Sequence, residues 1–127
     1  MKITISRILS TPLPPLIHFM SEIGCANSLW YGEKPIIGHE YFVEIDIRGE
    51  LIWEKDIIKS QDIFYYIQDI NDQIILNGYL ESYDEDGLGI LKMNDSLIQF
   101  MSKGDAFSIG TFIKLMPQEI SMYSINY

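Results

Sequence analysis

The sequence predicts a mainly β protein, a small antiparallel barrel or strongly curved sheet with one short helix near the N-terminus. Three observations favour this fold class. Polar and apolar residues alternate over short runs, turn-forming residues separate these runs in the second half, and 13% of the residues are aromatic, with eight tyrosines among them. A chain of 127 residues can bury a core of its own, so we expect residues 1–127 to form a single β-rich domain.

The N-terminal segment predicts a strand followed by a helix. Residues 1–9 alternate polar and apolar side chains, and the prolines within residues 11–15 end the strand because proline lacks an amide donor. In residues 16–23, apolar side chains fall at helical spacing on one face, namely Leu16, Phe19, Met20 and Ile23. We therefore expect a short helix, docked on the sheet because two helical turns are marginal alone.

Residues 26–38 are predicted to form a loop, because Asn, Gly and Pro interrupt any regular pattern. This loop carries two large aromatic residues, Trp30 and Tyr31. Such residues either anchor a long connection to the core or take part in recognition, since large rings dominate binding hot spots.

Residues 40–48 predict a clean strand whose polar face carries Glu44 and Asp46. A turn after this strand would let residues 51–54 pair with it as the next strand. Residues 60–71 fit either a helical face or a strand, and their aromatic and β-branched composition favours the strand.

The stretch 73–93 is the strongest predictor of architecture, because Asp86-Gly87 lies between two apolar β-type runs and is a hairpin signal with positive φ at both central positions. The punctuation of the second half predicts five strands over residues 74–83, 88–93, 96–101, 111–116 and 119–125. Short strands without helices between them indicate an antiparallel meander or small barrel. Four methionines are expected to fill its core, Met93, Met101, Met116 and Met122.

The chain carries 9 basic and 18 acidic residues, a net charge of −9. This field repels phosphate backbones and anionic lipid and attracts cationic partners, although solubility alone also accounts for it. The lone Cys25 leaves no internal disulfide and fits a reducing compartment. The N-terminus lacks the pattern of a signal peptide, and no stretch reaches the ~18 apolar residues of a membrane span, so we expect a cytoplasmic protein.

No diagnostic catalytic, metal-binding or phosphate-binding motif is present in the sequence. The acidic turn at residues 83–87 lacks the ligand spacing of a calcium loop, and His18 and His39 form no ligand pair. Cys25 with one of these histidines would be the nucleophile of an enzyme, but a buried free thiol is the simpler interpretation. We therefore expect no enzymatic activity, no metal and no cofactor.

The segment from residue 73 to residue 127 resembles an OB-fold in the rhythm of its strands. A long strand leads through the acidic hairpin into GILKMNDSLIQFM, and Gly110-Thr111 opens the last hairpin. The resemblance implies a barrel that binds single-stranded nucleic acid or oligosaccharide through aromatic platforms flanked by basic residues. The segment holds three cations, Lys92, Lys103 and Lys114, and this scarcity disfavours nucleic acid.

In general character the chain also resembles the immunity proteins of bacterial toxin systems. These are small, acidic, cytosolic domains without catalytic motifs that plug a toxin, often a basic nuclease. The resemblance implies stoichiometric binding and neutralisation of a basic toxin domain. OB-like binding of nucleic acid or sugar is the alternative.

The expected contact surface combines aromatic anchors with a charged rim, as tight and fast-associating interfaces do. Tyr79 and Tyr83 are expected to share a strand face with Glu81, and Trp53 neighbours an acidic residue. The predicted partner-binding residues are Tyr79, Glu81, Tyr83, Asp84, Glu85, Asp86, Glu44, Asp46 and Trp53.

Overall fold

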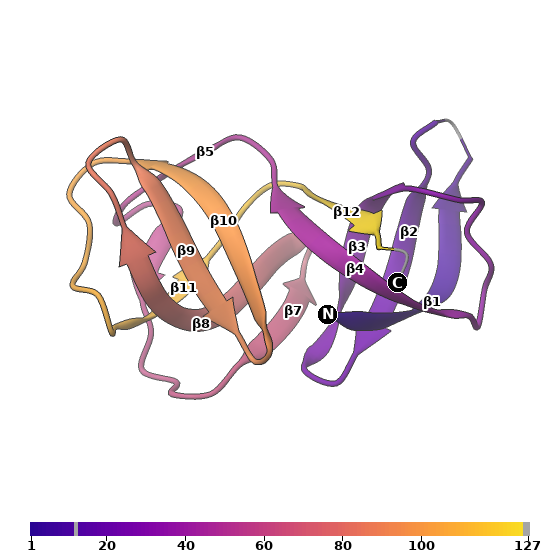
Figure 1. Cartoon of the computed structure of the whole chain (residues 1–127), viewed down its shortest axis with the longest axis horizontal. Helices are drawn as coiled ribbons and strands as arrows, with labels where there is room; N and C mark the ends of the chain where they lie inside the picture. The colour runs from indigo at the N-terminus through magenta and orange to yellow at the C-terminus, as the bar shows by residue number, and fades with distance from the viewer. Residues whose placement is uncertain (12, 126–127) are drawn as a thin grey trace.

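A computed structural model describes residues 1–11 and 13–125, and these residues form twelve strands and no helix. The molecule is elongated, with β1–β4 and β12 in one lobe and β5–β11 in the other (Figure 1). The strands are β1 (Lys2–Ser10), β2 (Leu16–Ser21), β3 (Gly24–Tyr31), β4 (Glu40–Ile47), β5 (Glu50–Ile52), β6 (Ile57–Lys59), β7 (Tyr66–Ile70), β8 (Gln73–Tyr83), β9 (Leu88–Met93), β10 (Ser96–Lys103), β11 (Phe112–Leu115) and β12 (Ile120–Ser124). The prediction of a mainly β fold is confirmed.

The first lobe is a closed barrel of five strands. β1, β2 and β3 form an antiparallel meander, and β4 pairs with β1 on its other side. The last strand, β12, closes the ring by pairing in parallel with β3 and antiparallel with β4. Large apolar side chains fill the interior, and Phe19, Trp30 and Met122 are each no more than 1% exposed.

The prediction of a helix over residues 16–23 is wrong, because β2 occupies residues 16–21 and a turn follows it. Ile17 and Phe19 are fully buried while Leu16, His18 and Met20 point outward, which is the period of a strand. These few residues fit both periodicities. The strand prevails because β1 and β3 lie on either side of it and supply backbone hydrogen-bond partners along its length.

The predicted loop over residues 26–38 is wrong in its first half, since β3 runs through to Tyr31, and right from residue 32, where the connection to β4 begins. Trp30 is 1% exposed and its indole N–H donates to the carbonyl oxygen of Glu33 at 2.7 Å. Trp30 therefore anchors the following loop to the barrel, and recognition by this ring is excluded by its burial.

The second lobe is built around the long strand β8. β8, β9 and β10 form an antiparallel meander, β7 pairs with the first half of β8, and β11 lies between β8 and β6. Trp53 lies under this sheet with 4% of its surface exposed, and its ring contacts those of Tyr83, Phe100 and Phe107. The indole N–H donates to the hydroxyl of Ser102 at 2.9 Å, which satisfies the buried polar group.

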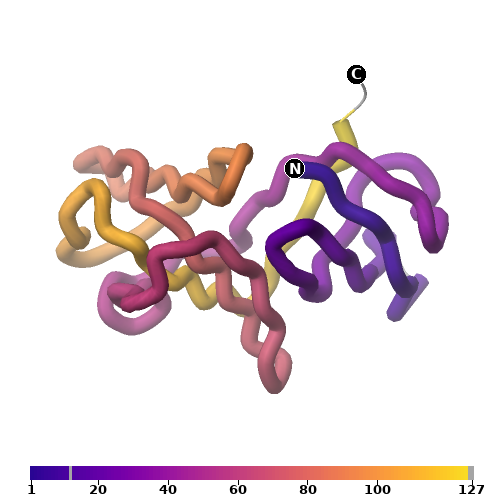
Figure 2. The backbone as a smooth tube through the Cα atoms, turned by 90° about the horizontal axis from the view of Figure 1, so that it is seen from below, coloured from indigo at the N-terminus to yellow at the C-terminus, as the bar shows by residue number. Residues whose placement is uncertain are grey.

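The expected pairing of residues 51–54 with the preceding strand is wrong. β5 leaves the barrel and pairs in parallel with β10 in the second lobe. The chain then builds the whole second lobe before returning to the barrel as β12, and Figure 2 shows this yellow C-terminal segment passing from one lobe into the other.

The five strands predicted in the second half are present, at β8–β12. Their turns have the expected chemistry: Asn71, Asp72 and Asn94 have φ values of 51°, 62° and 56° and sit in two-residue hairpin loops. The prediction that residues 73–127 themselves form the OB-like barrel is wrong, because only β12 of that segment enters the closed barrel. Met93 and Met122 are buried as expected, whereas Met101 is 43% exposed and Met116 is half-buried.

The two lobes join where β3 meets β7. Gly24 pairs with Ile67, and the amide of Ile67 donates to the carbonyl oxygen of Ile23 at 2.8 Å. The buried apolar side chains of both lobes belong to one cluster. A Cβ atom on Gly24 would overlap the backbone carbonyl of Ile67, and Gly24 also has a φ of 136°, so only glycine fits this junction.

We expect Gly24→Ala to lower the free energy of unfolding by about 3 kcal/mol or more, because steric overlap adds to an unfavourable φ. Gly49→Ala is the matched control, since Gly49 has a φ of 84° but nothing within 4 Å of the new Cβ, and it should cost about 1 kcal/mol. Urea denaturation of both variants measures the difference. Equal losses would contradict a tight junction at Gly24.

Candidate protein-binding surface

The acidic turn between β8 and β9 is held together by hydrogen bonds to Asp84. Asp84 accepts hydrogen bonds on Oδ1 from the amides of Asp86 at 2.9 Å and Leu88 at 3.0 Å. The carbonyl of Asp84 also accepts the amide of Gly87, and only Gly87 in this turn has positive φ, at 93°. The loop is thus longer than the two-residue turn expected from Asp86-Gly87, and Asp84 organises it, leaving Glu85 and Asp86 exposed.

Tyr79 and Tyr83 do not share a strand face, and this prediction is wrong. The β8–β9 register shifts between Leu80 and Ser82, where a β-bulge adds one residue to β8. A single inserted residue reverses the alternation beyond it. Tyr79 therefore faces outward with the exposed Glu81 beside it, whereas Tyr83 turns towards the core and packs edge-on against Trp53, with ring centroids 5.7 Å apart.

Trp53 cannot contact a partner in this structure, because 96% of its surface is covered by the second lobe (4% exposed). Its proximity to an acidic residue in the sequence gave no information on which way the ring points. Of the predicted set, the residues that remain on the surface of the second lobe are half-buried Tyr79 and exposed Glu81, Asp84, Glu85 and Asp86.

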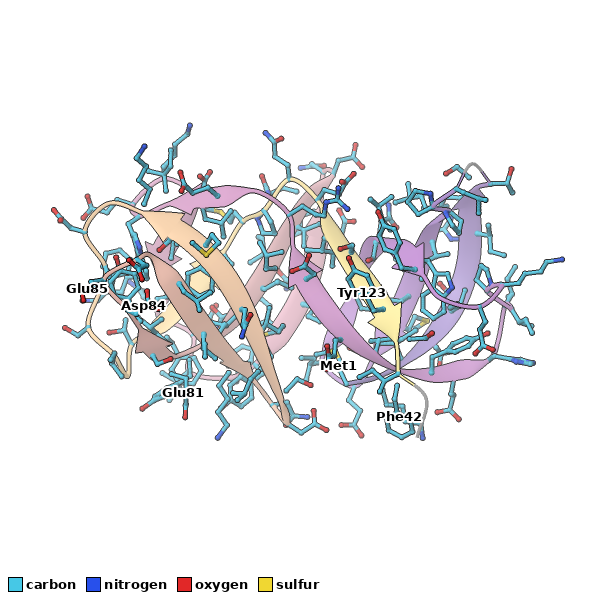
Figure 3. The ribbon with its side chains drawn as sticks, turned by 45° about the horizontal axis from the view of Figure 1, so that its top comes forward. Met1, Phe42, Glu81, Asp84, Glu85 and Tyr123 are labelled. Carbon is cyan, nitrogen blue, oxygen red and sulfur yellow. The ribbon has the colours of Figure 1, made fainter. Side chains whose placement is uncertain are left out.

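Glu44 and Asp46 lie on the other lobe, on the outer face of β4, where they alternate with buried Val43, Ile45 and Ile47. In Figure 3, Glu81, Asp84 and Glu85 lie at the far end of the second lobe, while Tyr123, Met1 and Phe42 lie on the barrel. The structure therefore divides the predicted residues between two separate surfaces. It does not bring Glu44 and Asp46 together with the acidic turn.

Glu44 and Asp46 instead line a groove of about 660 Å³ between the two lobes. One wall consists of β4 and β12 of the barrel, and the other consists of β9 and β10 of the second lobe. Leu97 and Tyr123 lie in the groove with 63% and 43% of their surfaces exposed, and Ile90 and Gln99 complete the second wall. No Lys or Arg side chain lines this groove among the described residues, and the N-terminal ammonium of Met1, which lies at the groove, donates to the carbonyl oxygen of Val43 at 3.1 Å.

The groove combines exposed apolar side chains with free carboxylates. Neither Glu44 nor Asp46 forms a salt bridge within the described part of the chain, whereas Lys2 pairs with Glu40, Arg48 with Glu119 and Lys114 with Asp62. A groove of this kind fits a cationic partner that also offers apolar side chains.

The sequence did not reveal Leu97, Gln99 and Tyr123 as site residues. Leu97 and Gln99 lie at exposed positions of the alternating strand β10. The sequence feature that could have identified the site is apolar Leu97 at a position where the alternation predicts exposure. Tyr123 is more than 70 residues from Glu44 in the sequence, yet it is its direct cross-strand partner in the barrel. Only the closure of the barrel by β12 brings them together.

A stacked tyrosine pair flanks the groove on the barrel. The rings of Tyr31 and Tyr123 lie 5.0 Å apart at 14°, and Arg48 donates to the Tyr31 hydroxyl at 3.1 Å. This hydrogen bond raises the pKa of the Arg48 guanidinium, and Glu119 adds to the effect. Arg48 therefore remains a cation held beside the aromatic pair.

A second aromatic surface lies over β8 and β11 of the other lobe. Phe112 packs against both Tyr79 and Tyr65, with centroid distances of 5.8 Å in each case. The buried amide of Asn77 donates to two carbonyls of the 60–65 segment, which holds Ile63 and Phe64 outward, 79% and 59% exposed.

Beside this surface, Tyr66 donates a hydrogen bond to Asp62 at 2.8 Å. Burial raises the pKa of the Tyr66 phenol, this hydrogen bond raises it further, and Lys114 acts in the opposite direction. Tyr66, Asp62 and Lys114 stabilise the segment that carries Ile63 and Phe64. The positive charge of Lys114 balances the negative charge of Asp62.

The residues considered for catalysis have structural neighbours. His18 shares a hydrogen bond of 2.8 Å with Asn27, and half-buried Cys25 lies opposite Met20 in the barrel. Among the described residues, no three His, Cys, Asp or Glu side chains gather as a metal site would require. The described part of the chain also contains no helix that is long and apolar enough to cross a membrane.

Comparison of this chain with protein-family models, with curated proteins and with solved structures gave no match.

We expect Asp84→Ala to lower the free energy of unfolding by about 1–2 kcal/mol, because two backbone amides of the turn lose their acceptor. Glu85→Ala is the matched control and should change stability by less than about 0.5 kcal/mol, since this side chain is exposed and has no structural role. Chemical denaturation distinguishes the two. A loss of similar size in both variants would show that Asp84 does not organise the turn.

Proposed function

We propose that this protein binds and neutralises a basic toxin domain, such as a nuclease effector, by occluding it stoichiometrically, as an immunity protein does. One observation carries the proposal: the inter-lobe groove places two carboxylates without a salt-bridge partner among the described residues, Glu44 and Asp46, beside exposed Leu97 and Tyr123. Apolar anchors contribute affinity when they are desolvated, and a carboxylate rim accelerates association with a cationic partner.

The charge of the whole chain supports the same conclusion. A net charge of −9 attracts a basic domain from beyond contact distance. The exposed Glu81 and Glu85 lie at the far end of the second lobe (Figure 3), and exposed Asp86 follows Glu85 in the same turn, so all three add to this long-range field. We assign them to steering and assign contact to the groove, because the groove places Glu44 and Asp46 beside exposed Leu97 and Tyr123.

An OB-like module that binds oligosaccharide or single-stranded nucleic acid is the second candidate. The observation that favours it is the closed five-stranded barrel, whose meander β1–β2–β3 is completed by β12 and β4, a ring that resembles a Greek-key barrel of OB type. The stacked Tyr31 and Tyr123 with Arg48 would supply an aromatic platform with one cation.

The first test requires a basic nuclease toxin domain, sought among the open reading frames next to the gene for this protein. We expect a one-to-one complex that abolishes nuclease activity, with an association rate that falls steeply as salt rises. Reversing the groove charges with Glu44→Lys and Asp46→Lys should slow association by about tenfold or more and flatten the salt dependence, because the attraction becomes repulsion. Stopped-flow or surface-based kinetics measure both effects.

The control is the pair Glu85→Lys and Asp86→Lys, which changes the net charge equally at the far end of the molecule. It should slow association less and leave the dissociation rate unchanged, since steering charges act at a distance. A larger loss in this control than in the groove variant would move the contact to the acidic turn. Retention of nuclease activity at saturating concentrations of this protein would refute neutralisation.

The OB-like candidate has a separate test. Oligothymidine, oligouridine and a panel of oligosaccharides are titrated at low and physiological salt by fluorescence anisotropy or calorimetry. We expect no micromolar binding of the oligonucleotides at physiological salt, because the acidic field opposes phosphate contacts. Micromolar binding of any of these ligands that Tyr123→Ala weakens by about 1–3 kcal/mol would favour the OB-like function instead, since a stacked ring contributes this much.

A further inference from the structure

We propose that the inter-lobe groove takes an extended basic segment of the partner, with a cationic side chain at every second residue and apolar side chains between them. This inference rests on the proposed function and deepens it, since it states which part of a basic partner enters the groove.

The two walls of the groove differ in chemistry. Both carboxylates, Glu44 and Asp46, stand on the barrel wall beside exposed Tyr123. Among the described residues, the wall of the second lobe has no carboxylate and presents exposed Leu97 and Gln99 with half-buried Ile90. An extended chain directs successive side chains to opposite sides. A segment lying between these walls would therefore place cations against β4 and apolar side chains against β9 and β10.

The spacing along β4 matches this pattern. Glu44 and Asp46 are two residues apart on one strand face, which separates them by about 7 Å. Lysine or arginine residues two apart on an extended segment have the same separation. Each carboxylate would then meet one cation without a change in backbone conformation on either side.

A second hollow of about 410 Å³ lies along the boundary between the lobes and carries three carboxylates together with Lys2, and Met1 lines both hollows. Its lining includes Glu22 and Asp95, one from each lobe, together with Glu40, which pairs with Lys2 at 3.0 Å. From Asp46 to Glu40, β4 runs for about 20 Å, so a segment of about six to eight residues would span both hollows.

The hollows hold about 660 and 410 Å³, in the range of small-ligand pockets, so side chains of an extended segment would enter them.

The test uses two fluorescent peptides of one composition: Gly-Lys-Leu-Lys-Leu-Lys-Gly, and Gly-Lys-Lys-Lys-Leu-Leu-Gly as the pattern control. Anisotropy at low salt should show the alternating peptide binding at least about fivefold more tightly, because only it matches both walls. Glu44→Gln with Asp46→Asn should weaken it about tenfold, the sum of two exposed ion pairs. Glu85→Gln with Asp86→Asn removes the same charge at the far end and should change affinity less than about twofold.

Leu97→Lys is the second variant, because this side chain is 63% exposed and its replacement leaves the core unchanged. It places a cation in the groove and should abolish peptide binding while the melting temperature stays that of the parent. Equal affinity for the two peptides, or equal losses in the groove and far-end variants, would overturn the inference, since binding would then reflect net charge alone.

Competition with the toxin domain separates the two proposals. Displacement of the alternating peptide by the toxin domain supports both. A one-to-one toxin complex that forms without displacing the peptide overturns the extended-segment inference and leaves the neutralising function intact. Peptide binding in the groove together with no toxin complex supports the inference about the groove and contradicts the proposed function.

Discussion

The insertion of β12 between β3 and β4 is the constraint on which the rest of the molecule depends. Without it, the barrel would be a four-stranded sheet with two open edges. Its residues seal the interior, since Met122 is fully buried and the hydroxyl of Ser28 reaches the carbonyl of Ile120 at 3.2 Å. Because β4 and β12 are separated by more than 70 residues, the intervening chain has to return to its starting point.

The second lobe is the consequence of that return. It leaves the barrel after β4, folds around Trp53 and the long strand β8, and re-enters at β12. The Gly24–Ile67 contact ties it back to the barrel. Two curved bodies connected in this way meet along only part of their surfaces. The groove between β4 and β10 lies where their outer faces diverge.

In this arrangement the acidic residues lie in two different environments. Around Asp84 the carboxylates belong to the end of a hairpin, and Asp84 itself holds the turn together by accepting hydrogen bonds from two backbone amides. In the groove, Glu44 and Asp46 stand beside Leu97 and Tyr123. Charge at an exposed tip acts mainly through long-range attraction, whereas charge beside apolar surface also contributes when water is displaced. The groove is for this reason the stronger candidate for contact.

The sequence by itself determined the features that depend on neighbouring residues. Turn-forming residues and alternation predicted the strands of the second half, because turn conformation and side-chain direction are local properties. The net charge and the acidic residues on the surface of the second lobe could also be predicted from the sequence. These local features were enough to define a mainly β protein.

Only the tertiary structure decided the rest. Residues 16–21 satisfy helical and strand spacing alike, and the hydrogen-bonding edges of β1 and β3 select the strand. The β-bulge near Glu81 turns Tyr83 inward. The alternation of side chains along β8 cannot reveal this bulge, because the extra residue is apparent only from the pairing of β8 with β9. The partnership of Glu44 with Tyr123, and of both with Leu97, requires the closure of the barrel, because pairing between distant segments depends on the packing of the whole chain rather than on local preference.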